Sequence, residues 1–424
     1  MSGARGAALA AAYAHGPGKS VRVSGTWREQ PRPRPAGAAL RGLTGGFAGA
    51  VRAVLDTALA PRRFEPWAAH NDHRAFPSAR AAHLHTAALR VPGRAARTLD
   101  PVRGLLLGPD PLPRAAVEAA GTVTVELSAA PERLRPGYGS LRDAIALLET
   151  GHVVGALVEA AAAHGLLAVA TLHPDAAAAT GGRAAGSAGP VASVVLAPGT
   201  APAWPLARVT APRSSGLAPC GLTADPRPLD GAALDRLVAD AVRTPPGSPA
   251  APSGPGARLR HRLMVRGVTG RADGVHVPGP PLARTGPAPD DDGLRALFAV
   301  PPSGFDVPGL PVVWLLTADV AGAVGEDGPG AYATLLLAAG AAAQHVCSAA
   351  AAHGLFCRPV RGVDDNGAEA AAGVGPGQDL LYALLLGRPR LPVHAPLLAY
   401  DLSDPEPPGD PEPPDDPEPP GGPA

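Results

Sequence analysis

Histidines beside a carboxylate are the residues of this sequence whose spacing comes nearest to a metal-binding pattern. His70 and His73 flank Asp72 in a loop, and His83 and His85 alternate along a predicted strand, so that they share one face. Protein zinc sites usually add cysteines or further histidines at short spacings, and no cysteine is near these pairs. We therefore interpret these histidines as surface or hydrogen-bonding residues rather than as metal ligands.

Two other chemical motifs are incomplete. Gly18-Lys19-Ser20 ends like a phosphate-binding P-loop, but that motif needs a glycine at the position of Tyr13. An α/β-hydrolase would need the pattern Gly-x-Ser-x-Gly between a strand and a helix, and the sequence does not contain it. The sequence therefore indicates neither P-loop nucleotide binding nor a serine hydrolase of that class.

The composition narrows the class of protein. The chain has 424 residues, of which 46% are hydrophobic but only 4% aromatic, so its core must be built mainly from Ala, Val and Leu. Its formal net charge is zero, which disfavours a general nucleic-acid or membrane-surface binder, since both need a basic excess. No run of about 18 or more strongly apolar residues predicts a membrane span. Cys220, Cys347 and Cys357 make no disulfide framework, which is typical of the reducing cytoplasm.

One stretch of the sequence occurs twice. Ala160–Leu166 and Ala349–Leu355 both read Ala-Ala-Ala-Ala-His-Gly-Leu, and the second copy lies 189 positions after the first, from His164 to His353. Gly151 agrees with Gly340 at the same offset. So, in residue character, do Val123, Val125, Leu127, Ser128 and Ala129 with Val312, Trp314, Leu316, Thr317 and Ala318. A strand-to-helix unit is therefore duplicated with its spacing intact. The duplication predicts two related halves that pack on each other within one chain, an intramolecular pseudo-dimer.

Hydrophobic periodicity predicts the same order of elements in both halves. The predicted helices cover residues 51–60 and 140–166 in the first half and 231–242 and 331–355 in the second. The predicted strands cover residues 83–91, 122–127 and 191–196, and then 263–268, 312–316 and 380–386. We divide the chain into an N-terminal arm (1–50), a first half (51–205), a second half (206–400) and a C-terminal tail (401–424).

The C-terminal tail differs in kind from the rest of the chain. Its sequence repeats Asp-Pro-Glu-Pro-Pro from Asp404, Asp410 and Asp416. Proline at this density blocks helix and sheet, and the acidic residues repel one another, so we predict a disordered, extended tail. A linker or spacer is the simpler interpretation, and a docking motif for a partner is the alternative.

Several segments, in the same order in both halves, resemble the nitroreductase-like flavoproteins. Within that superfamily they are most similar to the SagB-type azoline dehydrogenases, which mature thiazole- and oxazole-containing peptides made on the ribosome. The segments are Tyr138-Gly139, Leu147–His152 and His164–Leu166, with counterparts Gly330–Tyr332, Gln344-His345 and Gly354-Leu355, and also Pro77–His83, Val268–Arg271, Gly274–His276, Arg361–Asp365 and Leu385–Pro389. The resemblance covers most of residues 60–395.

This resemblance implies an α+β fold of two nitroreductase-like halves, with FMN bound at their interface. The residues that it implies for FMN binding are Arg213, Ser215, Arg361, Gly362, Arg388 and Arg390 from the second half, and Pro77, Ser78 and Arg80 from the first. The first half lacks the matching arginines, because Ala170–His173 and Pro198-Gly199 stand in their places. We therefore expect one FMN site, although any one of these arginines is alternatively an ordinary surface residue.

The resemblance leaves the catalytic base open. The best-known azoline dehydrogenases carry a Lys-Tyr pair before the glycine, whereas Gly137 precedes Tyr138 here and Lys19 is the only lysine of the chain. Tyr138 is the remaining candidate catalytic residue, because a phenol beside a flavin can relay a proton. It is alternatively a packed tyrosine at the start of a helix.

From the resemblance we predict FMN-dependent oxidation of azoline rings to azoles in a ribosomally made peptide, with thiopeptide biosynthesis as the preferred pathway. The expected partners are a precursor peptide and a cyclodehydratase, and a homo-oligomer is also open. Two alternatives remain. One is a general NAD(P)H-dependent nitro- or quinone reductase, and the other is a non-catalytic scaffold in a peptide-maturation complex.

Overall fold

The structure is a computed structural model. It describes residues 37–62, 73–108, 110, 112–139, 141–178, 189–199, 213–218, 221–251, 254–297 and 305–390. All of these residues belong to one structural unit, which begins at Gly37. The predicted tail at 401–424 and most of the predicted arm at 1–50 lie outside them.

The first half is built on a seven-stranded antiparallel sheet in the order β1-β4-β3-β2-β5-β7-β6. Its elements are β1 (Gly37–Ala39), α2 (Gly46–Leu59), β2 (His85–Arg90), β3 (Arg97–Asp100), β4 (Leu105–Leu107), α3 (Arg114–Ala120), β5 (Val123–Ala129), α4 (Leu141–Ala163), β6 (Leu166–Leu172), α5 (Pro174–Ala178) and β7 (Ala192–Pro198). Apolar residues of α2 and α4, such as Val51 and Leu157, pack with Val125 of β5 in one hydrophobic core. Residues 37–50 thus form β1 and the start of α2 in this half.

The second half is built on a six-stranded antiparallel sheet in the order β14-β13-β11-β15-β17-β16. Its elements are β8 (Leu217–Ala218), β9 (Gly221–Leu222), β10 (Leu229–Asp230), α6 (Gly231–Val242), β11 (Arg260–Val265), β12 (Val268–Thr269), β13 (Gly274–Val277), β14 (Ala283–Gly286), α7 (Asp291–Ala296), β15 (Val312–Ala318), α8 (Val320–Asp327), α9 (Ala331–Ala352), β16 (Phe356–Val360), α10 (Asp365–Ala371) and β17 (Asp379–Gly387). Small two-stranded sheets pair β10 with β12 and β8 with β9.

The two sheets share a common order at their centre. The run β2-β5-β7-β6 of the first sheet corresponds to β11-β15-β17-β16 of the second. Helix α4 follows β5 and precedes β6, as α9 follows β15 and precedes β16. The predicted α+β fold of two related halves is therefore confirmed.

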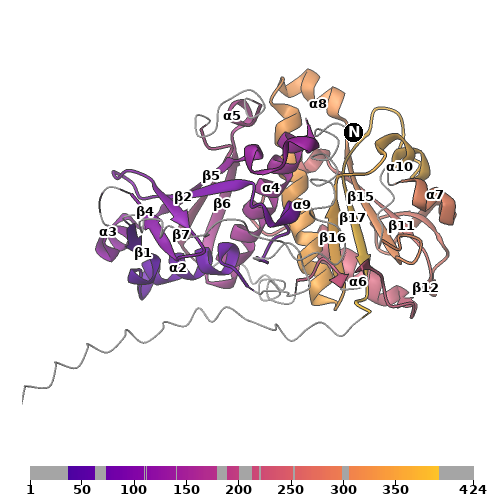
Figure 1. Ribbon diagram of the computed structural model, residues 1–424, viewed down its shortest axis with the longest axis horizontal. Coiled ribbons are helices and arrows are strands. Elements are labelled where there is room, and N and C mark those ends of the chain that lie inside the picture. The colour runs from indigo at the N-terminus through magenta and orange to yellow at the C-terminus, as the bar shows by residue number, and fades with distance from the viewer. Residues whose placement is uncertain are drawn as a thin grey trace, which may run out of the picture. The chain divides into compact units, whose positions relative to one another are not determined.

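The helices α4 and α9 lie side by side at the centre of the fold (Figure 1). Gly151 and Gly340, which the duplication relates, mark the point where their backbones come closest. A Cβ atom on Gly340 would lie 2.0 Å from the carbonyl oxygen of Leu148, and one on Gly151 would lie 2.2 Å from that of Leu337. No side chain fits at such distances, so glycine at both positions is what lets the halves pack.

The same two helices have the length and composition of a membrane span. However, the most apolar windows of α4 and α9 are 94% and 89% buried inside the fold, and the search covered only the described residues. Burial of this degree is typical of the core helices of a globular fold.

The two sheets differ in how their faces are covered. Every residue of β15 is buried, because α9 packs on one face and residues of α7 and α10 pack on the other. In the first sheet, β6 and β7 alternate between covered and solvent-facing positions, and Leu167 and Val169 of β6 are exposed. One face of the first sheet is therefore open at this edge.

Most predicted elements are present, and one predicted strand is wrong at its end. The strand predicted over 263–268 is interrupted by Gly267, whose φ of 57° lies in the left-handed region. The chain therefore leaves the main sheet after β11, and β12 pairs in parallel with β10 instead. The predicted central helices, 140–166 and 331–355, extend too far, because α4 ends at Ala163 and α9 at Ala352. The predicted glycine stops are present, since Gly165 and Gly354 both have positive φ and end the helical path.

Candidate functional site

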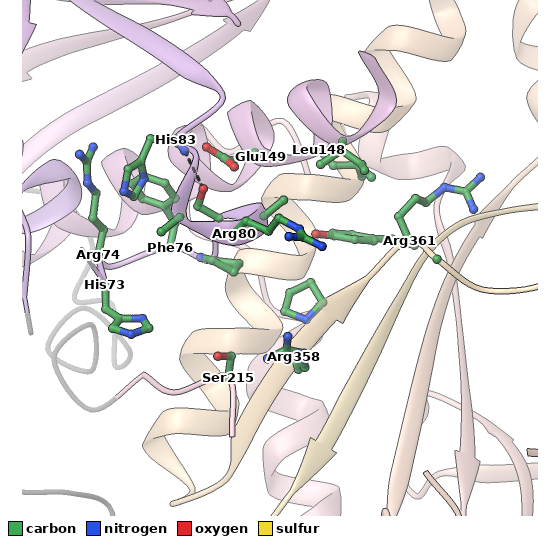
Figure 2. Close-up of a pocket in the computed structure, with 18 of the residues that line it drawn as sticks. His73, Arg74, Phe76, Arg80, His83, Leu148, Glu149, Ser215, Arg358 and Arg361 are labelled. Carbon is green, nitrogen blue, oxygen red and sulfur yellow. Dashed lines mark hydrogen bonds between the residues drawn. The ribbon is translucent and has the colours of Figure 1, made fainter. Parts of the chain in front are cut away.

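A pocket of about 290 Å³ lies between the two halves. Its walls combine a loop of the first half (residues 73–83), the start of α4, the segment before β8 and the end of β16 (Figure 2). The residues predicted from the resemblance that line it are Pro77, Ser78, Arg80, Tyr138, Arg213, Ser215, Arg361 and Gly362. The volume of about 290 Å³ is just below the roughly 300–1,000 Å³ typical of ligand pockets. The structure thus brings these residues together, and their roles in binding or catalysis stay predictions.

The loop of the first half holds an unusual backbone at the pocket. Arg80, Ala81 and His83 have φ values of 55°, 50° and 49°, in the left-handed region that side chains other than glycine rarely adopt. The N–H of His83 donates to Ser78 Oγ at 2.9 Å, which ties the end of this turn to its start. Such backbone strain is concentrated at binding and catalytic sites.

Tyr138 and Arg80 meet at the rim of the pocket. Arg80 Nε donates a hydrogen bond to Tyr138 Oη at 2.8 Å, and the guanidinium lies 5.7 Å from the centre of the phenol ring. Because the phenol oxygen accepts in this contact, its own O–H proton can point to a ligand in the pocket. The candidate catalytic tyrosine is therefore positioned by a residue that was predicted to bind the cofactor.

Arg213 crosses from the second half to the first. Its Nη2 donates to the carbonyl oxygens of Arg74 and Phe76, at 3.1 and 3.3 Å, and its side chain is buried. Hydrogen bonds from a charged donor are among the stronger contacts in a protein. Arg213 therefore fastens the loop of the first half against the second half.

Arg358, on β16, lines the same pocket and was missed from the sequence. Burial lowers the pKa of its guanidinium, and in the described part of the chain no carboxylate pairs with it. Its guanidinium carbon lies 4.9 Å from the centre of the Phe305 ring. The side chain is half-buried, so part of the hydration of its charge is lost without a counter-charge, and an anionic ligand would offset that loss.

Arg361 carries its own counter-charge. It forms two hydrogen bonds with Asp365, at 2.5 and 2.9 Å. Burial opposes the charge of Arg361, but the bonds to Asp365 outweigh it and raise the pKa of the guanidinium. In Figure 2 the guanidinium points away from the other labelled side chains. Arg361 therefore forms part of the wall, with its charge largely compensated.

The structure does not bring Arg388 and Arg390 to this pocket. The backbone of Arg388 accepts a hydrogen bond from the N–H of Asp225, and its side chain borders a separate hollow beside Asp225 and Arg227. Arg390 is exposed. The hydrogen bond to Asp225 holds the end of β17 beside this separate hollow. The two arginines that follow β17 in the sequence therefore lie away from the pocket.

A buried carboxylate, Glu149 of α4, also lines the pocket. Its Oε1 accepts from the N–H of Leu84 at 2.5 Å and lies 3.2 Å from His85 Nδ1. Its Oε2 is buried and has no hydrogen-bond partner among the described residues. Spacing in the sequence gave no signal for Glu149, because its partners come from a loop and strand more than 60 residues earlier in the chain.

The pocket histidine His83 is neutral over the physiological range. Burial, and then the positive charge of Arg74, lower its pKa to about 2. Neither ring nitrogen has a hydrogen-bond partner in the described structure. Within the described residues no group of histidines, cysteines and carboxylates could hold a metal ion, and His70 lies outside them. His83 is therefore available to a ligand as a neutral donor or acceptor.

Comparison with known proteins identifies the fold. A candidate nitroreductase from Anabaena variabilis superposes with a TM-score of 0.65 at 16% sequence identity, over 86% of this chain and 95% of that one. The chain has the nitroreductase fold. Neither a protein-family model nor a curated protein matches the sequence.

Weaker similarities extend over less than half of the chain. The Escherichia coli microcin synthetase McbBCD complex with truncated pro-MccB17 bound matches at 17% identity and a TM-score of 0.33, over 38% of this chain and 64% of that one. A nitroreductase family protein from Clostridium novyi matches at 14% identity and a TM-score of 0.29, over 43% of this chain and 83% of that one. At such scores neither similarity supports a conclusion on function.

Proposed function

We propose that this protein is an FMN-dependent oxidoreductase and that the pocket between its halves is the FMN site. The observation that carries the proposal is Arg358, a half-buried guanidinium at the pocket with no carboxylate partner in the described structure. A phosphate monoester would supply the missing negative charge. The nitroreductase fold, in a chain whose two halves meet at this pocket, supports the same interpretation.

The residues of the pocket fit the two ends of FMN. Arg358 and the hydroxyl of Ser215 come from the second half and would hold the phosphate. Gly362 faces open space, since a Cβ there would meet nothing within 4 Å, so its backbone is accessible to a flat ring. The buried Oε2 of Glu149 offers an acceptor to a ring N–H. Bound FMN would supply the hydride acceptor for an oxidation.

The twin position in the first half supports a single FMN site. At the offset of 189 residues, Val169 replaces Arg358 and Leu172 replaces Arg361. Without a guanidinium at these places the twin position cannot compensate a phosphate. The second half would therefore hold the phosphate, and the first half would close over the ring with its Pro77–Arg80 loop.

We infer an azoline ring of a ribosomally made peptide as the substrate, on the basis of the sequence segments that resemble SagB-type dehydrogenases. Conversion of an azoline to an azole removes a hydride and a proton from the ring. The groups of the pocket that can take or relay the proton are Glu149 Oε2 and Tyr138 Oη, and no lysine occurs among the residues that the structure describes. The partners proposed with this function are the precursor peptide and a cyclodehydratase, in the cytoplasm.

The test is made on the purified full chain. We expect it to retain one equivalent of FMN, and we expect an azoline-bearing peptide to bleach the visible flavin absorbance without air, with the absorbance returning when oxygen is admitted. Bleaching by NADPH instead would identify a general nitro- or quinone reductase. A colourless chain that binds no added FMN would contradict the proposal and favour a scaffold.

A further inference from the structure

A second cavity, of about 680 Å³, lies between the halves at the place that the duplication relates to the first pocket. Val169 and Leu172 of β6 line it where Arg358 and Arg361 line the FMN pocket. Its charged wall residues are Arg258 and Asp327, which pair with each other at 2.9 Å. The cavity is therefore suited to an uncharged ligand.

Ser248 lines this cavity and begins a chain of buried polar groups. Ser248 Oγ lies 3.0 Å from His345 Nε2, and His345 Nδ1 lies 2.8 Å from Glu159 Oε1. Ser348 Oγ donates to the other carboxylate oxygen of Glu159 at 2.8 Å. A hydroxyl, an imidazole and a carboxylate thus follow one another in the order that activates a serine nucleophile.

The hydrogen bonds fix the tautomer of His345. A carboxylate can only accept, so the proton on the imidazole is at Nδ1, facing Glu159. Nε2 is then the acceptor that faces the O–H of Ser248. Both His345 and Glu159 are fully buried, so bulk water does not compete for either contact. Ser248 stands between this pair and the cavity.

The loop that carries Ser248 is held firmly against β6. The N–H of Ser248 donates to the carbonyl oxygen of Pro245 at 3.2 Å, and Gly247 between them has a φ of 80°, as in a type II turn. The N–H of Ala170 donates to Gly247 O at 2.9 Å. Gly247 also lines the cavity, and its N–H has no acceptor among the described residues. It is a donor that a developing oxyanion could use.

We propose that this second cavity is an acyl-transfer site for uncharged esters, with Ser248 as nucleophile, His345 as general base and Glu159 as positioning residue. Ser248 Oγ bonds to the ester carbonyl carbon while its proton passes to His345 Nε2. The bond from that carbon to the alcohol oxygen breaks, and His345 returns the proton to the departing alcohol. Water then releases the acid from Ser248 by the same steps, so that no oxidant or cofactor is required.

The chain offers a matched contrast in a second serine–histidine pair. His173 Nε2 lies 3.1 Å from Ser193 Oγ, but no carboxylate in the described structure bonds to His173, and neither residue lines the second cavity. If a serine–histidine hydrogen bond alone were enough for activation, both serines would react. If the carboxylate and the cavity are needed, only Ser248 will react.

The experiment treats the native full chain with a fluorophosphonate probe, which phosphonylates activated serines with loss of fluoride, and locates the label by peptide mass spectrometry. We expect label on Ser248 and none on Ser193. Ser248→Ala should remove the label, His345→Gln should slow labelling at least about a hundredfold, and Ser193→Ala should leave it unchanged. Hydrolysis of a p-nitrophenyl ester should follow the same pattern.

Two results would overturn the proposal. One is a folded native chain in which Ser248 stays unlabelled, and the other is labelling of Ser248 that persists at the native rate in a folded His345→Gln variant. If His345→Gln does not fold, as judged by thermal melting, the labelling of Ser248 against Ser193 in the native chain decides the matter. The probe needs no flavin, so this test is independent of the FMN proposal.

Discussion

The two cavities occupy equivalent places in a duplicated fold and differ in their chemistry. The smaller one is lined by Arg80, Arg213 and Arg358, whereas the larger one presents Val169 and Leu172 beside a serine. The helix crossing between them is unchanged, with glycine at both related positions. Each glycine of the crossing contacts the other helix, so neither half can replace its glycine without affecting both. The residues that line one cavity, in contrast, can change without any change in the other cavity.

The largest loss of stability is expected where α4 and α9 cross, at Gly151 and Gly340. Gly340→Ala places a Cβ 2.0 Å from Leu148 O, and the clash involves backbone on both sides, so relief requires the helices to separate. We expect a loss of about 3 kcal/mol or more in the free energy of unfolding, measured by chemical denaturation. The control is Gly325→Ala in α8, where a Cβ meets nothing within 4 Å. Equal stability of the two variants would refute the steric account.

The next effect separates the two cavities by charge. Arg358→Gln should weaken FMN binding by about 10- to 100-fold, because a charge-assisted contact with phosphate is worth roughly 1.5–3 kcal/mol. Arg388→Gln is the matched control and should bind FMN like the native chain, since Arg388 borders another hollow. Quenching of flavin fluorescence on titration measures both. If Arg388→Gln weakened FMN binding more than Arg358→Gln does, the phosphate would be assigned to Arg388 at the end of β17 instead.

A third prediction concerns the pH dependence of the interface between the halves. Burial lowers the pKa of His152 to about 3, although the contact with Gln344 at 3.2 Å partly opposes the shift. The folded chain therefore resists protonation that the unfolded chain accepts below about pH 6.5, so stability is full above that pH and falls below it. We expect His152 to contribute about 1.4 kcal/mol of this loss per pH unit.

The measurement compares the native chain with His152→Gln by denaturation at several pH values between neutrality and mild acid. Other buried histidines, such as His261 with a pKa of about 4, contribute to both chains and cancel in the difference. Parallel pH profiles of the two chains would show that His152 does not titrate between the folded and unfolded states as expected.

The smallest effect distinguishes the faces of the two sheets. Val195 on β7 is 37% exposed, whereas Val313 on β15 is 3% exposed. Val195→Thr should change the unfolding free energy by less than about 0.5 kcal/mol, and Val313→Thr should cost at least about 1 kcal/mol, because it buries a hydroxyl. Thermal melting of the pair measures this. Similar losses at both positions would show that the outer face of the first sheet is covered in solution.

The fold was largely predictable because the sequence of one half is partly repeated in the other. The repeated pairs His164-Gly165 and His353-Gly354 lie just beyond the ends of both central helices, and the offset indicates which strands correspond. The prediction failed where a single residue redirects the chain, as at Gly267. A glycine within a run of strand-forming residues can either continue the strand or end it with a positive φ. Hydrophobic periodicity alone does not distinguish these two cases.

The site was predictable only where its residues are contiguous in a recognised segment. Pro77, Ser78 and Arg80 lie together in the sequence and in the pocket. Glu149 lies in the recognised segment Leu147–His152, but its place in the pocket was not predictable. Its contacts with Leu84 and His85 arise from packing of segments that are distant in the sequence. Arg358 carried a usable signal, since its counterpart at the offset of 189 is the apolar Val169. A residue-by-residue comparison of the halves would have singled it out.

Because α4 and α9 cross at the two glycines, each half completes the hydrophobic core of the other. Leu147 and Leu148 of α4 belong to the same hydrophobic core as α9 and the second sheet. A fragment that carried only residues 213–390 would leave the flat, small-residue side of α9 facing water, and the readiest cover for it is the same side of another fragment. Cutting the chain between its halves would thus convert one asymmetric molecule into a population of symmetric pairs, in which both clefts of each pair are alike.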